Sequence, residues 1–228
     1  MPEPLVPTTG WVVLHLFLRG GPSADGEAIA AAVKAAGASA DLQVVSFALL
    51  GHKADFGVMV LGADLWRVRA VQTALAAAGA VVADSYVSLT EVSEYAKGMP
   101  EEMKTPRLYP HLPPAAKTAF CFYPMSKRRW VGANWFDQPY DERERLMREH
   151  GATGRTFAGR VTQLITGSTG LDGFEWGVTL FAGTPDDLKD VVYTMRYDEA
   201  SARFAEFGPF YAGAVAPIDE VLASVGLL

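Results

Sequence analysis

The sequence predicts an α+β protein made of two fused ferredoxin-like halves of the dimeric α+β barrel type. Helical and strand periods alternate in the order β-α-β-β-α-β along residues 1–96, and the same order returns along 119–228. The segments "DFGVMVLGADLWRVR" (55–69) and "EWGVTLFAGTPDDLKDV" (175–191) also align, as expected after an internal duplication. Antiparallel sheets from two such halves can form one barrel-like core, which leaves room for a ligand in one half.

The N-terminal half, residues 1–96, has a clear signal for each element. Apolar and β-branched runs indicate strands, and an alanine-rich stretch indicates the first helix. The predicted elements are strand 11–20, helix 24–38, strands 42–50 and 56–61, helix 63–79 and strand 80–89. A linker is expected over 97–118, because this segment contains five prolines and neither a helical nor a strand period.

The C-terminal half, residues 119–228, repeats this plan. Its predicted elements are strand 118–126, helix 138–150, strands 157–166 and 174–182, helix 185–196 and a last helical stretch from about Asp198. Gly151 is expected to cap the first of these helices in a left-handed conformation. Pro185 suits the first turn of the second helix.

The stretch "CFYPMSKRR" (121–129) interrupts an apolar strand with a proline and ends it in three cations. Side chains alternate between the two faces of a strand, so Tyr123, Met125 and Lys127 are expected on one face. Pro124 donates no hydrogen bond to a neighbouring strand. This predicts an edge strand, or a strand that leaves its sheet at Pro124.

Composition excludes several classes of protein. The 228 residues are 50% hydrophobic, with no apolar run of the length that spans a membrane. The N-terminus lacks the pattern of a signal peptide, which favours a cytoplasmic protein. A net charge of −6 argues against a nucleic-acid partner. Cys121 is the one cysteine, which excludes an internal disulfide and any multi-cysteine metal site.

Positive charge is concentrated between residues 127 and 160, where eight Lys and Arg residues stand against five Asp and Glu residues. A basic segment in an acidic protein indicates a small anionic ligand. The alternative is a solvated helix face, because "DERERLMREH" also has the spacing of ion pairs within a helix. The sequence leaves both interpretations open.

The four histidines are the main candidates for chemistry. His15 lies in a predicted strand and His52 in a turn, and both are more consistent with structural or surface roles. His150 is either a cation at a helix C-terminus or an axial ligand of haem iron. His111 is either an exposed linker residue or a residue carried over a bound ligand. Motifs for dinucleotide, phosphate or zinc-protease sites are missing from the sequence.

Several segments of the C-terminal half resemble one known family. "FYPMSKRR", "NWF", "MREHGATGR", "GRVTQLITGSTGLDGFEWGVTLFAG" and "DDLKDVVYTMRYDEASARFAEFGPFY" are similar to the coproheme decarboxylase branch of the chlorite dismutase superfamily. The resemblance implies two fused ferredoxin-like halves, a pentameric ring and a porphyrin in the C-terminal half. It also implies a reaction in which hydrogen peroxide decarboxylates two propionates of iron coproporphyrin III (coproheme) and gives haem b through a three-propionate intermediate.

The resemblance also implies roles for individual residues. His150 matches the proximal iron ligand, and Tyr123 matches the tyrosine that becomes a radical beside a propionate. Lys127 matches the lysine that pairs with a propionate and helps the second decarboxylation. The remaining matches are Met125 near the porphyrin edge, Arg155 and Ser201 at propionates, Gln163 on the distal side, and His111 as distal base.

The partners that the resemblance implies are hydrogen peroxide, further copies of the chain in a homopentamer, and a ferrochelatase in transient contact. Neither nucleic acid nor a membrane is expected. Two other functions stay open at this point. A non-catalytic haem carrier or sensor would need His150 but not Tyr123 with Lys127. A chlorite dismutase-like peroxidase would require arginine at the position of Gln163.

Overall fold

The structure, a computed structural model, describes residues 2–96 and 98–228. Residue 1 and residue 97, the first position of the predicted linker, lie outside the described residues. The elements of the described chain are β1 (Val12–Gly20), α1 (Gly26–Gly37), β2 (Leu42–Leu49), β3 (Phe56–Gly62), α2 (Leu65–Ala77), β4 (Ala80–Thr90), α3 (Glu101–Leu108), β5 (Ala119–Lys127), β6 (Arg129–Trp130), β7 (Ala133–Asn134), α4 (Tyr140–Arg155), β8 (Val161–Gly167), β9 (Trp176–Ala182), α5 (Pro185–Met195), α6 (Glu199–Phe204), β10 (Ala205–Phe207), β11 (Tyr211–Val215) and α7 (Ile218–Ser224).

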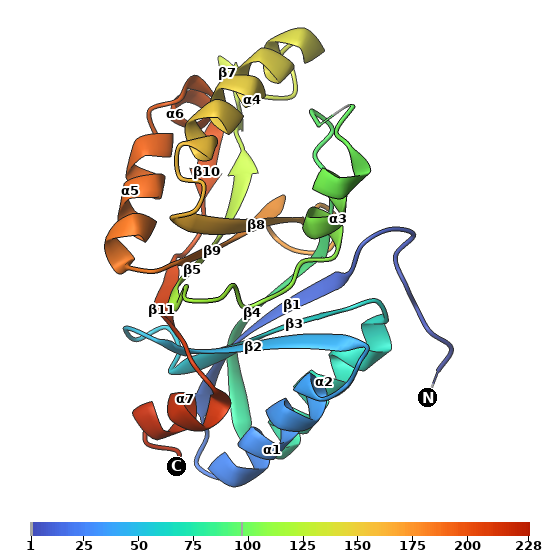
Figure 1. Cartoon of the computed structure of the whole chain (residues 1–228), viewed down its shortest axis with the longest axis vertical. Helices are drawn as coiled ribbons and strands as arrows, with labels where there is room; N and C mark the ends of the chain where they lie inside the picture. The colour runs from blue at the N-terminus through green and yellow to red at the C-terminus, as the bar shows by residue number, and fades with distance from the viewer. Residues whose placement is uncertain (1, 97) are drawn as a thin grey trace.

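Eight of the described strands close into one antiparallel barrel. Their order around the ring is β5-β11-β2-β3-β1-β4-β8-β9, and β9 pairs with β5 to complete it. Each half contributes four strands in the ferredoxin-like order, β4-β1-β3-β2 in the N-terminal half and β11-β5-β9-β8 in the C-terminal half. The halves join where β4 pairs with β8 and where β11 pairs with β2. The predicted fold class is confirmed, and the two halves lie one above the other (Figure 1).

Aromatic packing and buried polar pairs fill the barrel. Phe17 stacks on Tyr211 with ring centroids 3.7 Å apart. His15 lies fully inside, and its Nε2 is 3.0 Å from Thr179 Oγ1 on β9. Burial lowers the pKa of His15 to about 3, so the ring is neutral at physiological pH. His15 therefore joins the two halves in the core, in agreement with the structural role that the sequence favoured.

Pro124 does not lie on an edge strand, so that prediction was wrong. β5 is paired on both sides, with β9 on one and with β11 and then β10 on the other. The neighbour changes from β11 to β10 at Pro124, whose carbonyl accepts a hydrogen bond from Gly208 N at 2.8 Å. Pro124 lacks an N–H at the point where neither β11 nor β10 needs one from it. Its proline ring therefore leaves the pairing of β5 with both strands intact.

Two further local predictions were wrong. Gly151 does not cap a helix, because α4 continues through it to Arg155 and the φ angle of Gly151 is not positive. The predicted linker also contains α3, which the periodicity did not indicate. Glu101 and Glu102 stand in its first turn, and Pro106 stands inside it. Within the described chain, no helix is both long and apolar enough to cross a membrane.

Candidate ligand-binding site

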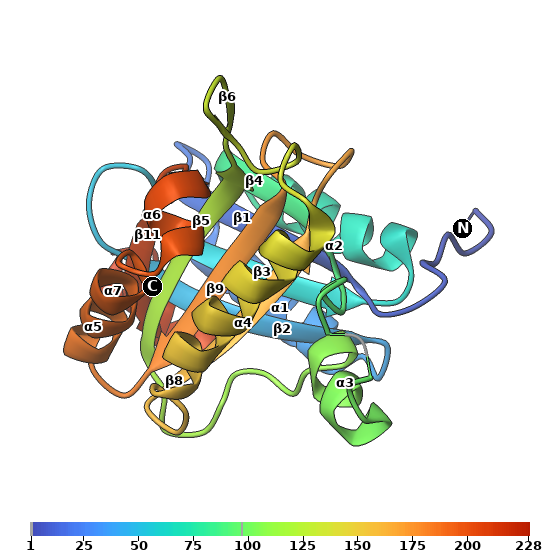
Figure 2. The same ribbon diagram turned by 90° about the horizontal axis from the view of Figure 1, so that it is seen from above.

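The two halves cover the outer faces of their sheets differently. In the N-terminal half, α1, α2 and α7 pack a continuous apolar core against the sheet. In the C-terminal half, α5 covers β5 and β9, but Gln163 on β8 is exposed and Ile165 is 42% exposed. Figures 1 and 2 place α4 above the outer face of β8 and β9. Leu146 is the one buried residue among the sixteen of this helix.

This incomplete burial marks the candidate site. A helix in a globular protein normally buries a whole stripe of side chains against its sheet. Helix α4 instead packs against α5 and α6, and the face of β8 below it stays uncovered. An exposed strand face beside a helix that buries so little of its surface is a candidate binding surface for a large ligand.

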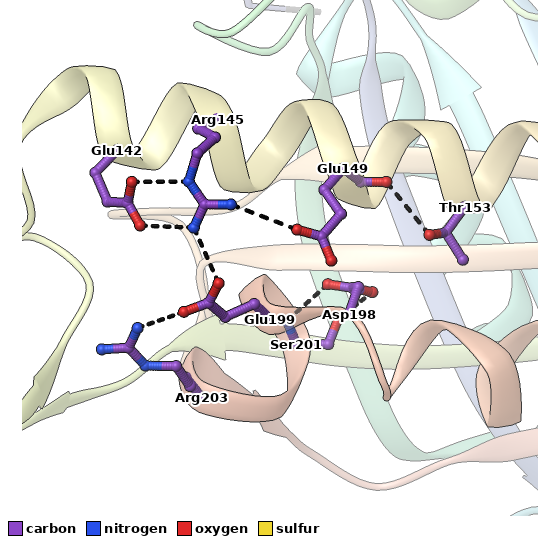
Figure 3. A network of polar contacts seen from close by, with 8 residues as sticks. All are labelled: Glu142, Arg145, Glu149, Thr153, Asp198, Glu199, Ser201 and Arg203. Carbon is purple, nitrogen blue, oxygen red and sulfur yellow. Dashed lines mark hydrogen bonds and ion pairs between the residues drawn. The ribbon is translucent and has the colours of Figure 1, made fainter.

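A network of ion pairs fixes α4 to α6 (Figure 3). Arg145 Nη2 on α4 contacts Glu142 at 2.8 Å and crosses to Glu199 on α6 at 2.9 Å. Arg145 Nη1 lies 3.6 Å from Glu149, and Glu199 also pairs with Arg203 at 2.6 Å. Exposed pairs contribute little each, but this network joins two elements that both carry site residues.

His150 lies at the junction that this network fixes. Its Nδ1 is 3.0 Å from Oδ2 of Asp198, the buried residue that precedes α6. Ser201 donates to the same carboxylate at 3.1 Å from its hydroxyl and at 2.9 Å from its backbone N–H. Burial alone would raise the pKa of Asp198, but the hydrogen bonds from His150 and Ser201 hold it below its ordinary value. Asp198 is therefore an ionised acceptor.

The second nitrogen of His150 is available for a ligand. Within the described residues, Nε2 makes no hydrogen bond, and the side chain is 24% exposed. A carboxylate on one ring nitrogen fixes the tautomer and makes the other nitrogen the donor to a metal. From the sequence, Asp198 was expected only to begin a helix. Its contact with His150 spans 48 residues of sequence, so no local signal could have identified it.

Tyr123 and Met125 lie on the outer face of β5, as strand alternation predicted. Tyr123 is buried, stacked on Phe210 at 4.4 Å and edge-on to Phe207 at 5.5 Å between centroids. Its hydroxyl has no hydrogen-bond partner among the described residues, but the oxygen is not fully enclosed, so solvent or a ligand can reach it. Burial also raises the pKa of Tyr123 above its ordinary value, so the phenol keeps its proton.

Lys127 ends the same strand and is buried, with 7% of its surface exposed. Its Nζ donates to the carbonyl of Ala200 at 3.1 Å and lies 4.5 Å from the centre of the Trp135 ring. Burial lowers the pKa of Lys127 to about 8, opposed by the charges of Asp198 and Glu175. The strand thus delivers an ammonium to the α6 side of the site without a direct carboxylate partner.

Most of the basic segment has a structural explanation. Five of its eight cations make ion pairs with carboxylates: Arg129, Arg143, Arg145, Arg148 and Arg160. The interpretation as helix-face ion pairs is correct for Arg145 and Arg148, whereas Arg143 pairs with Glu94 outside the helix. In the described part of the chain, Lys127, Arg128 and Arg155 have no carboxylate within 4.0 Å. Two of these three, Lys127 and Arg155, are residues that the resemblance assigned to propionates.

The structure does not bring His111 to this site. Gln43 of β2 holds both neighbours of His111, donating to the carbonyl of Pro110 at 2.6 Å and accepting from Leu112 N at 2.9 Å. β2 is four strands from β8 in the ring of eight, on the opposite side of the barrel. His111 lines a cavity of about 780 Å³ with residues of the N-terminal half. This placement argues against the predicted role as distal base over Gln163.

A second cavity of about 320 Å³ lies beyond the end of β5. Ser126, Lys127 and Arg129 line it together with residues of the loop 169–175. Glu175 in this loop accepts from Lys127 N at 2.8 Å and pairs with Arg129. Tyr123, His150 and Gln163 do not border this cavity. It therefore adjoins the candidate site at Lys127 and does not contain it.

Comparisons with known proteins agree with this fold. The chlorite dismutase family profile matches residues 24–216. A haem-binding protein from Thermus thermophilus superposes with a TM-score of 0.85 at 34% identity, over 99% of each chain. A mutant chlorite dismutase from Candidatus Nitrospira defluvii superposes with a TM-score of 0.77 at 21% identity, over 96% of this chain and 97% of that one.

A curated relative from Natronomonas pharaonis, named as a candidate haem-binding protein, is 42% identical over 246 residues. The match covers 93% of this chain but only 40% of that relative. The chain thus spans less than half the length of that protein.

Proposed function

This chain belongs to the chlorite dismutase family, and we propose that within it the protein is a coproheme decarboxylase. It would use hydrogen peroxide to convert two propionates of iron coproporphyrin III to vinyl groups, giving haem b through a three-propionate intermediate. One observation carries this proposal. His150 offers an unpartnered Nε2, and Tyr123 and Lys127 lie on the outer face of β5 in the same half of the chain.

The residues of the site fit an iron porphyrin. His150 has Asp198 on one ring nitrogen and leaves the other free, the arrangement that metal-ligating histidines commonly have. On the uncovered face of β8, Ile165 offers apolar contact to a large planar ring, and the sparsely buried α4 lies beside it. Lys127 and Arg155 provide positive charge without carboxylate partners, which suits the carboxylates that the porphyrin carries.

Each residue would have a distinct task. His150 would hold the iron, and Asp198 with Ser201 would orient its ring. Lys127 would pair with a propionate and keep it beside Tyr123. Tyr123 would give up its phenolic hydrogen atom to the oxidant and then take a hydrogen atom from the β-carbon of the propionate. Loss of carbon dioxide, with one further electron passed to the oxidant, would then leave the vinyl group. The porphyrin iron, when bound, supplies the oxidising power by reaction with peroxide.

Gln163 favours this reaction over chlorite chemistry. Its amide is exposed on the outer face of β8, where chlorite dismutases place an arginine according to the resemblance. An amide can orient a small ligand by hydrogen bonding but brings no positive charge. A non-catalytic haem carrier would also use His150, and the unpartnered hydroxyl of Tyr123 is the observation that favours an enzyme. We further propose that the protein acts in the cytoplasm as a homopentamer, with hydrogen peroxide as its co-substrate.

We expect the purified protein to convert iron coproporphyrin III in two steps when peroxide is added. Mass spectrometry should first show loss of one carbon dioxide with two hydrogens, and then a second such loss to the mass of haem b. The porphyrin incubated with peroxide alone is the control. If the porphyrin binds but its mass is unchanged after excess peroxide, the decarboxylase proposal is wrong and the non-catalytic carrier is the remaining function.

Binding of the porphyrin is expected to weaken as the pH rises above about 8. Lys127 has a pKa of about 8 in the folded protein, so its ammonium, and with it the attraction for a propionate, is present below this pH and lost above it. Titrations by absorption at pH 7 and pH 9 should show this change in wild type. Lys127→Met should bind more weakly at pH 7 and lose most of the difference between the two pH values. An unchanged difference in this variant would assign the pH dependence to another group.

A further inference from the structure

Glu91 brings a carboxylate onto the same outer sheet face as the proposed site. It follows the last residue of β4, and its carboxyl group occupies the space above Gly167 on β8. A Cβ atom on Gly167 would lie 2.2 Å from Oε2 of Glu91. Side chains of Gln163 and Ile165 leave β8 on this face, whereas Leu164 points into the barrel core. Gly167 therefore lies on the ligand side, and its lack of a side chain is what admits the carboxylate.

A neighbouring indole holds this carboxylate in place. Trp176 on β9 donates from Nε1 to Oε1 of Glu91 at 3.1 Å. Trp176 is opposite Gly167 on β8 and opposite Met125 on β5. One row across three strands therefore runs from Met125, through Trp176, to the Glu91 carboxylate. Burial raises the pKa of Glu91 above its ordinary value, although the hydrogen bond from Trp176 opposes this rise.

Charge is distributed asymmetrically along this row. On the β5 side, Lys127 follows Met125 by two residues and brings its ammonium to the site. On the β4 and β8 side, Glu91 has no Lys or Arg within 4.0 Å in the described part of the chain. A flat ligand on this face would meet a cation at one edge and an anion at the opposite edge.

We propose that Glu91 is a specificity-determining residue that selects a ligand with one edge free of carboxylates. This inference rests on the proposed function, because it takes the ligand to be an iron coproporphyrin. In isomer III, one of the edges between neighbouring pyrroles carries a methyl group at both of its positions. In isomer I, methyl and propionate alternate around the whole ring, so every such edge carries a propionate.

The two isomers have the same mass, the same four propionates and the same net charge. They differ only in where the carboxylates lie, so overall electrostatic attraction cannot distinguish them. Glu91 is exposed in the structure, and a bound ring would exclude water from this face, so a ligand carboxylate facing Glu91 would be repelled. Glu91 thus provides a repulsive element against the wrong isomer, which is a common basis of specificity.

The test compares equilibrium binding of the iron complexes of isomers III and I by absorption titration, without peroxide. Wild type is expected to prefer isomer III by about fivefold. Glu91→Gln keeps the oxygen that accepts from Trp176, so it should fold normally, and it should reduce the preference to less than twofold by binding isomer I more tightly. Glu91→Lys should remove or reverse the preference. Glu102→Gln, at an exposed position of α3, is the matched control and should keep the wild-type preference.

The possible outcomes separate this inference from the proposed function. Equal binding of both isomers by wild type, or an unchanged preference in both Glu91 variants, would overturn the role of Glu91 and leave the proposed function standing. If Glu91→Gln weakens the binding of both isomers equally, Glu91 is only a structural partner of Trp176. If wild type binds neither isomer, the proposed function itself fails.

Discussion

His150→Ala is expected to abolish axial coordination of the porphyrin iron and to lower turnover by more than ~100-fold. Loss of outer partners of a metal ligand already costs up to about 100-fold, and this change removes the ligand itself. Within the described residues, no other histidine lies near Asp198: His15 is enclosed in the barrel and His111 is held by β2. The absorption spectrum of the ferric complex and the rate of product formation measure the two effects.

The cationic side chains of the site should still retain some porphyrin in this variant, so binding alone is a poor measurement. His52→Ala, which changes an exposed histidine in a turn, is the matched control and should match wild type in both spectrum and rate. A wild-type ferric spectrum in His150→Ala would contradict the assignment of His150 as the iron ligand.

Asp198→Asn should keep His150 as the iron ligand but change the absorption spectrum of the ferric complex. A neutral amide is a weaker acceptor for the ring N–H than a carboxylate.

Most strands were predictable because hydrophobic periods depend on local sequence. β10 and β11 were missed, because only a helical stretch was expected after Asp198. A barrel-like core was predicted, but the strands that pair between the two halves were not. Two ferredoxin-like halves can pack in more than one way. Pro124 shows the limit of local rules. A missing N–H is tolerated within a central strand when the neighbouring strand changes at that residue, and this change depends on residues 205–211, far along the chain.

Some residues of the candidate site were also predictable from local sequence, and others were not. Alternation along β5 placed Tyr123, Met125 and Lys127 on one face without any tertiary information. Asp198 and Glu91 could not be inferred from spacing, because each meets its partner across a long stretch of chain, His150 in one case and Trp176 in the other. Gly151 was misassigned because glycine often ends a helix, and only the ion pairs and packing of α4 show that the helix continues to Arg155.

Tyr123→Phe is expected to bind iron coproporphyrin III almost as tightly as wild type and to lose decarboxylation by at least ~100-fold. The substitution removes only the hydroxyl, which has no hydrogen-bond partner in the described structure, and it keeps the stacking on Phe210. The free energy of unfolding should therefore change by less than about 0.5 kcal/mol. The loss in rate has the scale of removing a group that exchanges a hydrogen with the substrate.

Product masses after peroxide addition, combined with porphyrin titration and thermal unfolding, separate chemistry from binding and stability in this variant. Tyr193→Phe is the matched control, because Tyr193 is exposed on α5 and the same hydroxyl is removed there. Product formation at a wild-type rate in Tyr123→Phe would place the oxidised side chain elsewhere, with Trp135 beside Lys127 the first residue to change. Loss of product together with loss of binding would instead make Tyr123 a packing residue. Only retained binding with lost chemistry is consistent with a phenol whose burial keeps it protonated until a hydrogen atom is taken from it.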